Sequence, residues 1–347
     1  MTVVVAGVGL ASAIPTSAFA DPPGPTDYRS EIQSVVPETP AIEMGVIGGD
    51  AFLELRVAAG TEAVVIGYEG ESYLWFRSDG VVLENQNSPA TYLNTSRYGG
   101  EGVPATVRPD AEPIWHQVST GGYWAWHDHR AHWMQSARPV GLAAGDQILE
   151  AVIPVVVDGA DVDVTVISTW QPEPSPLAPW FGAVAGLGLG VGLWFLRGRR
   201  FPPIAAVVPL AVLALGVGAA RYLSLPGATG PRPIWIVLPT IAVVSAVVGV
   251  VLAERRMVFA ADAALLFVGV ELAVWGYLER SGLSAAIIPT AAPFWLDRFS
   301  TAFALAGGVS IAVVALWWLF AVPAGSSTAD AVSDSREPQG SPRRAHP

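Results

Sequence analysis

Hydrophobic and polar positions divide the chain into two parts. Up to about residue 170, short apolar runs alternate with turns that contain Gly and Asp, as in AFLELRV (51–57), EAVVIGY (62–68), SYLWFR (72–77) and GVVLEN (80–85). Runs of this length and spacing are typical of strands in a β-sandwich or barrel. In the segment 147–170, Asp158-Gly159 stands between two Val-rich runs and predicts a hairpin. The second run alternates Val with Asp and Thr, so one face is expected to be buried.

From residue 178 onward the pattern changes to long apolar segments at about 178–196, 201–220, 233–253, 258–278 and 300–322. Each is close to the roughly 20 residues that a helix needs to cross the hydrocarbon core of a bilayer. The Pro-rich segment 171–177 is expected to be a stiff linker. The predicted fold class is an all-β ectodomain, an Ig-like β-sandwich of residues 21–170. It is followed by an all-α transmembrane bundle of about five helices, residues 178–322.

The two ends of the chain and its loop arginines predict an orientation. The first apolar run is too short to span a bilayer and ends in Ala18-Phe19-Ala20, so residues 1–20 are expected to be a signal peptide, with an uncleaved anchor as the alternative. Arginines are concentrated in the short loops after the first and third apolar segments. The positive-inside rule then places the β domain outside the plasma membrane and the C-terminus in the cytoplasm. The polar tail, 323–347, is expected to be disordered.

Composition narrows the classes of partner. Only 14% of the residues are charged and 52% are hydrophobic, which fits a chain that lies largely in lipid. A formal net charge of −11 argues against nucleic acid as a partner, and the chain has no Gly-rich phosphate loop that would bind a nucleotide. The lack of cysteine excludes disulfides, thiolate metal sites and cysteine nucleophiles. The expected partners are the lipid bilayer and, as an open alternative, another envelope protein.

The stretch WAWHDHRAHWM, 124–134, contains three of the five histidines. If it is a strand, His127 and His129 lie on one face about 6.5–7 Å apart, which suits two ligands of one metal ion. A turn after Arg130 would add His132, and His116 is a candidate fourth ligand from a neighbouring strand. Imidazole ligands without thiolates favour copper, zinc or nickel. No cofactor is certain from the sequence, and copper or zinc is the candidate.

Two non-metal interpretations of the same stretch stay open. Asp128 and Arg130 are two residues apart, as expected for a carboxylate–guanidinium pair, and Trp126 and Trp133 would supply packing area beside them. The stretch is then a structural polar network. Alternatively, these side chains and Met134 form a patch that binds a partner.

Three further features carry polar groups in unusual places. Glu69 and Glu71 in YEGESY are expected to lie on a tight turn as solvated carboxylates rather than as an acid/base pair. Glu271 lies within an apolar segment, as either a buried hydrogen-bonding group or part of a proton relay, with Arg221, Arg280 and Arg298 as candidate partners. The apolar loop 280–300 is expected either to lie in the membrane interface or to dock under the β domain.

Three blocks resemble, in the same order, those of a family of uncharacterised exported membrane proteins of high-GC Gram-positive bacteria. The blocks are the Tyr-Glu-Gly-Glu turn (68–71), Ser-Pro-Ala-Thr-Tyr-Leu-Asn (88–94) and Trp-His-Asp-His-Arg-x-His-Trp-Met (126–134). The resemblance covers roughly residues 28–170 and implies an exported β-sandwich without a known activity. The layout is also similar to that of copper-handling proteins that join an exported β-sandwich to membrane helices, but Met-rich stretches are missing.

These features together favour a non-enzymatic, membrane-anchored envelope protein. Its exported sandwich is expected to act as a binding, sensing or scaffold module, because no convincing catalytic constellation is present. The alternative is binding and delivery of a transition metal of the copper type through the histidines.

Overall fold

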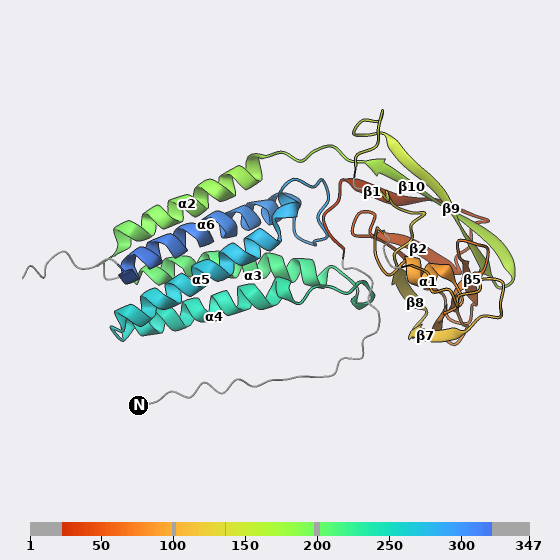
Figure 1. The fold of residues 1–347 in the computed structure, drawn as a ribbon, viewed down its shortest axis with the longest axis horizontal. Coiled ribbons are helices and arrows are strands. Elements are labelled where there is room, and N and C mark those ends of the chain that lie inside the picture. The colour runs from red at the N-terminus through yellow and green to blue at the C-terminus, as the bar shows by residue number, and fades with distance from the viewer. Residues whose placement is uncertain (1–22, 99–101, 136, 198–201, 321–347) are drawn as a thin grey trace, which may run out of the picture.

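The chain folds into a β domain and a helical bundle joined end to end (Figure 1). The structure is a computed structural model and describes residues 23–98, 102–135, 137–197 and 202–320. The predicted signal peptide, 1–20, and the predicted tail, 323–347, lie outside the described residues.

Ten strands of the described residues form two antiparallel sheets in the β domain. The larger sheet has seven strands in the order β1-β10-β9-β4-β5-β6-β7, and the smaller has three in the order β2-β3-β8. The strands are β1 (Tyr28–Val36), β2 (Ile42–Ile47), β3 (Phe52–Val57), β4 (Ala63–Ile66), β5 (Ser72–Phe76), β6 (Val82–Asn85), β7 (Trp115–Ser119), β8 (Tyr123–Trp126), β9 (Gln147–Val157) and β10 (Ala160–Trp170). A short helix, α1 (Pro89–Leu93), follows β6.

One hydrophobic core holds the two sheets together. Leu53 and Leu55 of β3 belong to the same buried cluster as Val65 of β4 and Ile153 of β9. Burial of such side chains stabilises the fold by about 1.5–3 kcal/mol each. The predicted sandwich is therefore confirmed, with a core that both sheets line.

The predicted hairpin between the two longest strands is also present. Asp158 and Gly159 both adopt positive φ, at 48° and 82°, as a two-residue turn of type I′ requires. In β10, Val162, Val164 and Val166 are buried while the intervening positions face outward. The alternation in the sequence thus reports directly which face of the strand meets the core.

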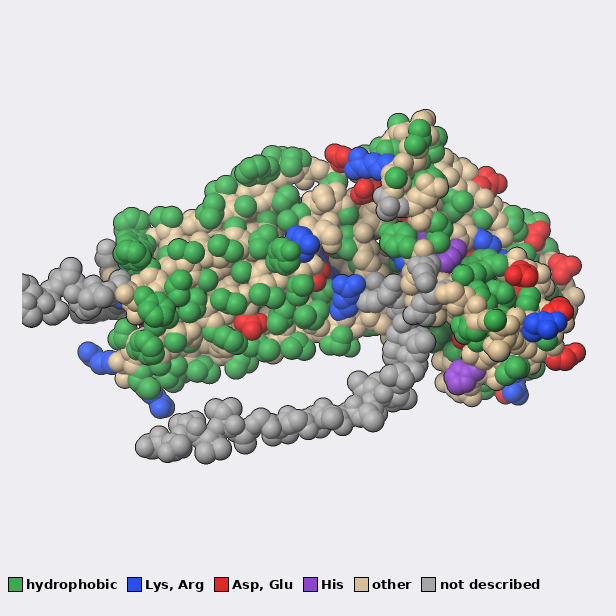
Figure 2. Space-filling model, in the orientation of Figure 1, with side chains coloured by type: hydrophobic (Ala, Val, Ile, Leu, Met, Phe, Trp, Pro, Cys, Tyr) green, Lys and Arg blue, Asp and Glu red, His purple; other side chains and the backbone are tan. Residues whose placement is uncertain are grey.

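Within the described residues, five helices are long and apolar enough to cross a membrane, so the chain is a membrane protein. They are α2 (Leu177–Leu196), α3 (Val208–Leu223) with its preceding turn η1 (Pro203–Val207), α4 (Ile234–Glu254), α5 (Val258–Leu278) and α6 (Phe294–Phe320). Two further short turns, η2 (Gly227–Thr229) and η3 (Arg280–Leu283), lie at the end next to the β domain. Hydrophobic side chains cover the visible face of the bundle, whereas charged ones gather mostly on the β domain (Figure 2).

The last helix begins earlier than the sequence predicts. We expect a span of 300–322 after a loop of 280–300, but α6 starts at Phe294. The prediction fails because Asp297 and Arg298 interrupt the apolar pattern, although both are buried within the helix and bonded there. A hydropathy pattern cannot anticipate charges that find partners inside the protein.

Glycines on α2 allow the first and last helices to approach closely. A Cβ added to Gly182 would lie 2.3 Å from Phe299 O, and one added to Gly186 would lie 2.4 Å from Gly307 N. Gly190 meets Ser310 in the same way. The four-residue spacing therefore marks the face of α2 that packs against α6, as expected for small residues between membrane helices.

The loop between α5 and α6 docks under the β domain. Thr26 and Ile287 exchange two backbone hydrogen bonds of 3.0 and 2.8 Å, and the Ala286 N–H donates to Asp27 Oδ1. Gly49, at a φ of +87°, passes so close to Ile287 that a Cβ would lie 3.1 Å from its Cγ2. Of the two placements considered for this loop, docking against the β domain is the one that the structure shows.

Candidate functional site

The histidine-rich stretch is a strand end followed by a turn. Strand β8 stops at Trp126, whereas the strand interpretation assumed that it continues through Arg130. The Asp128 carboxylate accepts the Arg130 N–H at 3.0 Å, and the Asp128 carbonyl accepts the Ala131 N–H at 2.9 Å. These bonds compete with sheet pairing and turn the chain away from β3.

Asp128 is the centre of a buried polar network. Its carboxylate accepts hydrogen bonds from Arg130 Nε at 2.9 Å, from the Arg130 terminal nitrogen at 2.8 Å and from Trp126 Nε1 at 3.1 Å. Burial alone would raise the pKa of this carboxyl, but the hydrogen bonds and charge of Arg130 outweigh it and lower the pKa. Asp128 therefore stays ionised, and the pair acts as a fixed structural unit.

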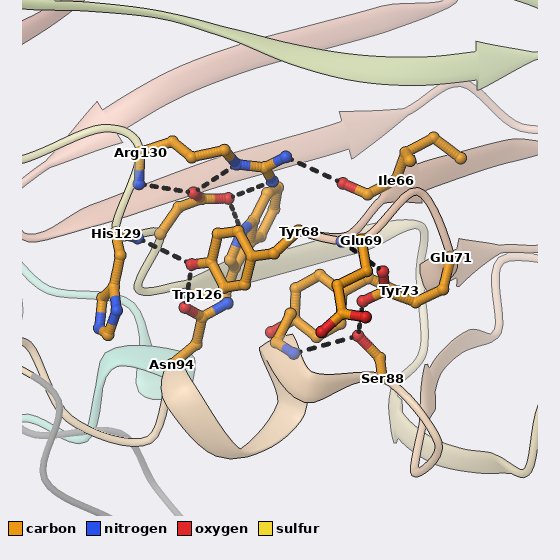
Figure 3. A network of polar contacts seen from close by, with 12 residues as sticks. Ile66, Tyr68, Glu69, Glu71, Tyr73, Ser88, Asn94, Trp126, His129 and Arg130 are labelled. Carbon is orange, nitrogen blue, oxygen red and sulfur yellow. Dashed lines mark hydrogen bonds and ion pairs between the residues drawn. The ribbon is translucent and has the colours of Figure 1, made fainter. Parts of the chain in front are cut away.

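The three sequence blocks 68–71, 88–94 and 126–134 meet in this network (Figure 3). The Tyr68 hydroxyl donates to Asn94 Oδ1 at 2.5 Å and accepts the His129 N–H at 2.9 Å. Arg130 lies 4.9 Å from the centre of the Tyr68 ring and donates to Ile66 O. Residues that are up to 64 positions apart thus order one another at a single corner of the domain.

Glu71 corrects the expectation for the YEGESY turn. The turn exists, with Gly70 at a φ of 86°, but only Glu69 is exposed. Glu71 is buried, accepts the Ser88 hydroxyl at 2.5 Å and accepts the Glu69 N–H at 2.8 Å. Ser88 in turn caps α1 by accepting the Ala90 N–H. The prediction of two solvated carboxylates is wrong for Glu71. Its buried carboxylate accepts hydrogen bonds from Ser88, which lies 17 residues away in the sequence, and from the Glu69 N–H.

The turn brings the three histidines of the motif together. The His132 ring lies 5.5 Å from the His129 ring and 6.5 Å from the His127 ring, both edge to face. His127 Nδ1 is 2.5 Å from Ala51 O, and its ring stacks on Phe52. His129 Nε2 is 3.0 Å from Ser96 O. His132 Nδ1 is 3.3 Å from Trp133 O, so each of the three rings has a nitrogen next to a backbone carbonyl.

The arrangement of donors does not make a ready metal centre. Within the described ranges, no group of three or more His, Asp or Glu side chains is placed to hold a metal ion. His116 is exposed on β7, where it faces Glu84 of β6 across the larger sheet. The structure brings together His127, His129 and His132, whereas His116 lies on strand β7 at the edge of the larger sheet.

A buried polar cluster beside the histidines has no signal in the sequence pattern. Arg97 donates to Asp50 Oδ1 at 2.5 Å and to Thr26 Oγ1 at 3.2 Å. Asp50 Oδ2, Arg97 Nε and His132 Nε2 are buried and lack hydrogen-bond partners among the described residues. Burial and then the charge of Arg97 lower the pKa of His132 to about 3. This imidazole is therefore neutral at physiological pH.

The last two residues of the motif lead out of the core. Trp133 is half-buried, donates from Nε1 to Ala137 O at 2.8 Å and lies 6.4 Å from the Tyr28 ring. Met134 is half-buried on the same segment. Tyr28 lines the cleft described below, so the motif extends from the network to the surface that faces the membrane domain.

In the part of the chain that the structure describes, no hydrogen bond or ion pair joins Glu271 to Arg221, Arg280 or Arg298. Glu271 is half-buried on α5, and its Oε2 has no hydrogen-bond partner among the described residues. Arg221 instead bonds Asp297 of α6 and Glu279 at the end of α5, and Trp235 donates to Glu279 at 2.9 Å. Arg298 donates to the carbonyls of the docked loop. These charged groups join the helices at the end of the bundle next to the β domain.

A cleft of about 480 Å³ lies between the β domain and the bundle. Asp27, Tyr28, Tyr98 and Arg138 line it from the β domain, and Glu173 lines it from the linker. Leu283, Ser284 and Ala285 of the docked loop complete its wall. The centres of the Tyr98 and His132 rings lie 6.5 Å apart, with the rings nearly perpendicular. The cleft thus adjoins the histidine cluster and exists only because both domains contribute to it.

Comparison with models of protein families, with curated proteins and with solved structures found no match.

Proposed function

We propose that the protein is a non-enzymatic binding or sensing module of the cell envelope, whose β domain faces outward from the plasma membrane. The observation that carries this proposal is the cleft shared by the β domain, the linker and the docked loop. Clefts where two domains meet are common ligand sites. The motif residues around Asp128 support such a role by making the β domain rigid beside the cleft.

The outward orientation is supported by the loop arginines. Arg197 and Arg255 directly follow α2 and α4, at the end of the bundle away from the β domain (Figure 1). An excess of arginine in short loops favours the cytoplasmic side. The predicted signal peptide agrees with the same orientation.

The cysteine-free chain allows a direct test of orientation. Thr106→Cys places a thiol on an exposed loop of the β domain, and Glu254→Cys places one at the end of α4 away from the β domain. In intact cells, a membrane-impermeant maleimide is expected to label the first variant and to label the second only after permeabilisation. The reverse pattern would overturn the proposal.

Binding in the cleft is tested by photocrosslinking in intact cells. A benzoylphenylalanine replaces Ser284, which lines the cleft, and Ser281 serves as the matched control because it is exposed on the same loop outside the lining. An adduct is expected from position 284 and not from 281. If neither position yields an adduct, the cleft is not a binding site.

Metal binding is the second candidate. It is favoured by the contact among the rings of His127, His129 and His132 and by the buried His132 Nε2, which lacks a hydrogen-bond partner among the described residues. Copper or zinc would have to displace at least one of the carbonyls that hold His127 and His129. Titration of the purified full-length protein with Cu(I), Cu(II) and Zn(II) tests this candidate. Equal affinity of wild type and His132→Gln would reject it.

A further inference from the structure

The cleft between the domains continues along the helical bundle, between α2 and α6, as an apolar groove. This groove, of about 290 Å³, is lined by Trp180, Ala183, Ala302, Leu305 and Ala306 of α2 and α6. It shares three lining residues with the cleft: Pro176, Pro179 and Leu283. The polar cleft and the apolar groove are therefore contiguous, so one amphiphile could occupy both.

The order of the cleft and the groove along the bundle matches that of the headgroup and hydrocarbon regions of a bilayer. Helix α6 has 27 residues and so is ~40 Å long, about 10 Å longer than the hydrocarbon core, which leaves its first turns at headgroup level. Trp180 and Trp295 are 68% and 61% exposed near this end of the bundle, as is typical of tryptophans at the membrane interface. With α6 placed in this way, the groove, whose lining includes Ala302, would be at the level of acyl chains and the cleft at the level of headgroups.

The charges in the cleft are mixed. Arg138 lies 3.0 Å from a Glu173 carboxylate oxygen and 3.7 Å from an Asp27 oxygen, and its side chain is 55% exposed. A guanidinium binds a phosphate well, and carboxylates bind an ammonium group. Two carboxylates beside one guanidinium disfavour an anionic headgroup and complement one that carries both a phosphate and an amine.

We propose that the cleft and groove together bind one phospholipid with a zwitterionic amine headgroup, such as phosphatidylethanolamine. Its phosphate meets Arg138, its ammonium group meets Glu173 and Asp27, and one acyl chain lies in the groove between α2 and α6. The proposal rests on the proposed function, since it names the ligand of the same cleft.

Native mass spectrometry of the delipidated full-length protein in detergent tests the lipid. With added phosphatidylethanolamine, we expect one retained lipid per protein, and with phosphatidylglycerol we expect about tenfold weaker retention. Equal retention of the two lipids would overturn the headgroup assignment.

Two pairs of variants locate the lipid on the protein. Ala183→Phe fills the groove, whereas Val184→Phe adds the same side chain at the next position of α2, which is 62% exposed and outside the groove lining. Arg138→Gln removes the phosphate partner, and Arg108→Gln removes an exposed arginine that is also paired with a carboxylate. Retention is expected to fall about tenfold for the first member of each pair only. Equal retention within either pair would overturn the placement.

The test separates failure of this inference from failure of the proposed function. If position 284 crosslinks to a protein or to a soluble compound and phosphatidylethanolamine is not retained, the cleft binds a ligand but not this lipid. If position 284 gives no adduct at all, both proposals fail.

Discussion

Asp128→Asn isolates the energetic role of the buried network. The carboxylate is fully buried and accepts four hydrogen bonds, three of them from Arg130 and one from Trp126. Asparagine keeps the size but removes the charge and replaces one acceptor by a donor. Arg130, with a side chain only 20% exposed, is then left as a largely buried, uncompensated cation.

Breaking a buried ion pair by removing one partner costs about 3–5 kcal/mol. For a domain of about this size, each kcal/mol lowers the melting temperature by roughly 2–4 °C, so the midpoint is expected to fall by roughly 6–20 °C. Thermal unfolding of the full-length protein in detergent, followed by tryptophan fluorescence, measures this change. The probe is suitable because Trp126 belongs to the network.

The chain offers a matched control at the same sequence spacing. Asp110 pairs with Arg108, but both side chains are exposed, so Asp110→Asn is expected to cost only about 0–1 kcal/mol. Because the pKa of Asp128 is lowered, its stabilisation is present above the ordinary Asp pKa of about 3.9 and is lost as the pH falls through the lower folded value. The difference between wild type and Asp128→Asn must therefore shrink at acidic pH. Equal, small losses in both variants at pH 7 would refute the reasoning.

Three other perturbations follow from described features. Burial raises the pKa of Glu84 to about 7, so the wild type loses stability as the pH rises from the ordinary Glu pKa toward 7. In chemical denaturation, Glu84→Gln should be more stable than the wild type by roughly 1–3 kcal/mol at pH 8 and equally stable at pH 4. The pKa of His132 is lowered to about 3, so the stability that its neutral imidazole contributes is present above pH 6.5 and is lost as the pH falls toward 3. His132→Gln should therefore flatten the profile of melting temperature against pH between pH 6 and pH 4. Gly186→Ala places a Cβ 2.4 Å from Gly307 N and should cost about 1–3 kcal/mol, whereas Gly188→Ala meets open space and should stabilise by up to ~1 kcal/mol; similar melting temperatures for the two would contradict the α2–α6 packing.

The sequence predicts elements well where a local pattern decides the structure. Strict alternation in β10 and the Asp158-Gly159 turn predict the hairpin, and hydropathy predicts the membrane helices, because both signals depend on neighbouring residues. Prediction from the sequence fails where contacts with distant residues decide the local structure. Glu71 is buried because Ser88 bonds it, and α6 starts at Phe294 because Asp297 has a partner on another helix.

The candidate site shows the same division. The carboxylate–guanidinium spacing of Asp128 and Arg130 is visible in the sequence, and the structure pairs the two. The bond from Arg97 to Asp50 joins residues 47 positions apart, and no local pattern marks it. The cleft is harder still to foresee, because its walls come from the β domain, the linker and a loop between membrane helices.

Both domains are closed by elements from opposite ends of their own segments. In the β domain, β1 pairs with β10, and in the bundle the glycine face of α2 meets α6. During synthesis, α2 therefore enters the membrane with no counterpart for its glycine face until the final helix has been made. The loop that seats the β domain also lies directly before that helix. A chain truncated before α6 would keep the β1–β10 pairing but leave the glycine face of α2 without its partner, so the bundle is completed only when the last span is in place.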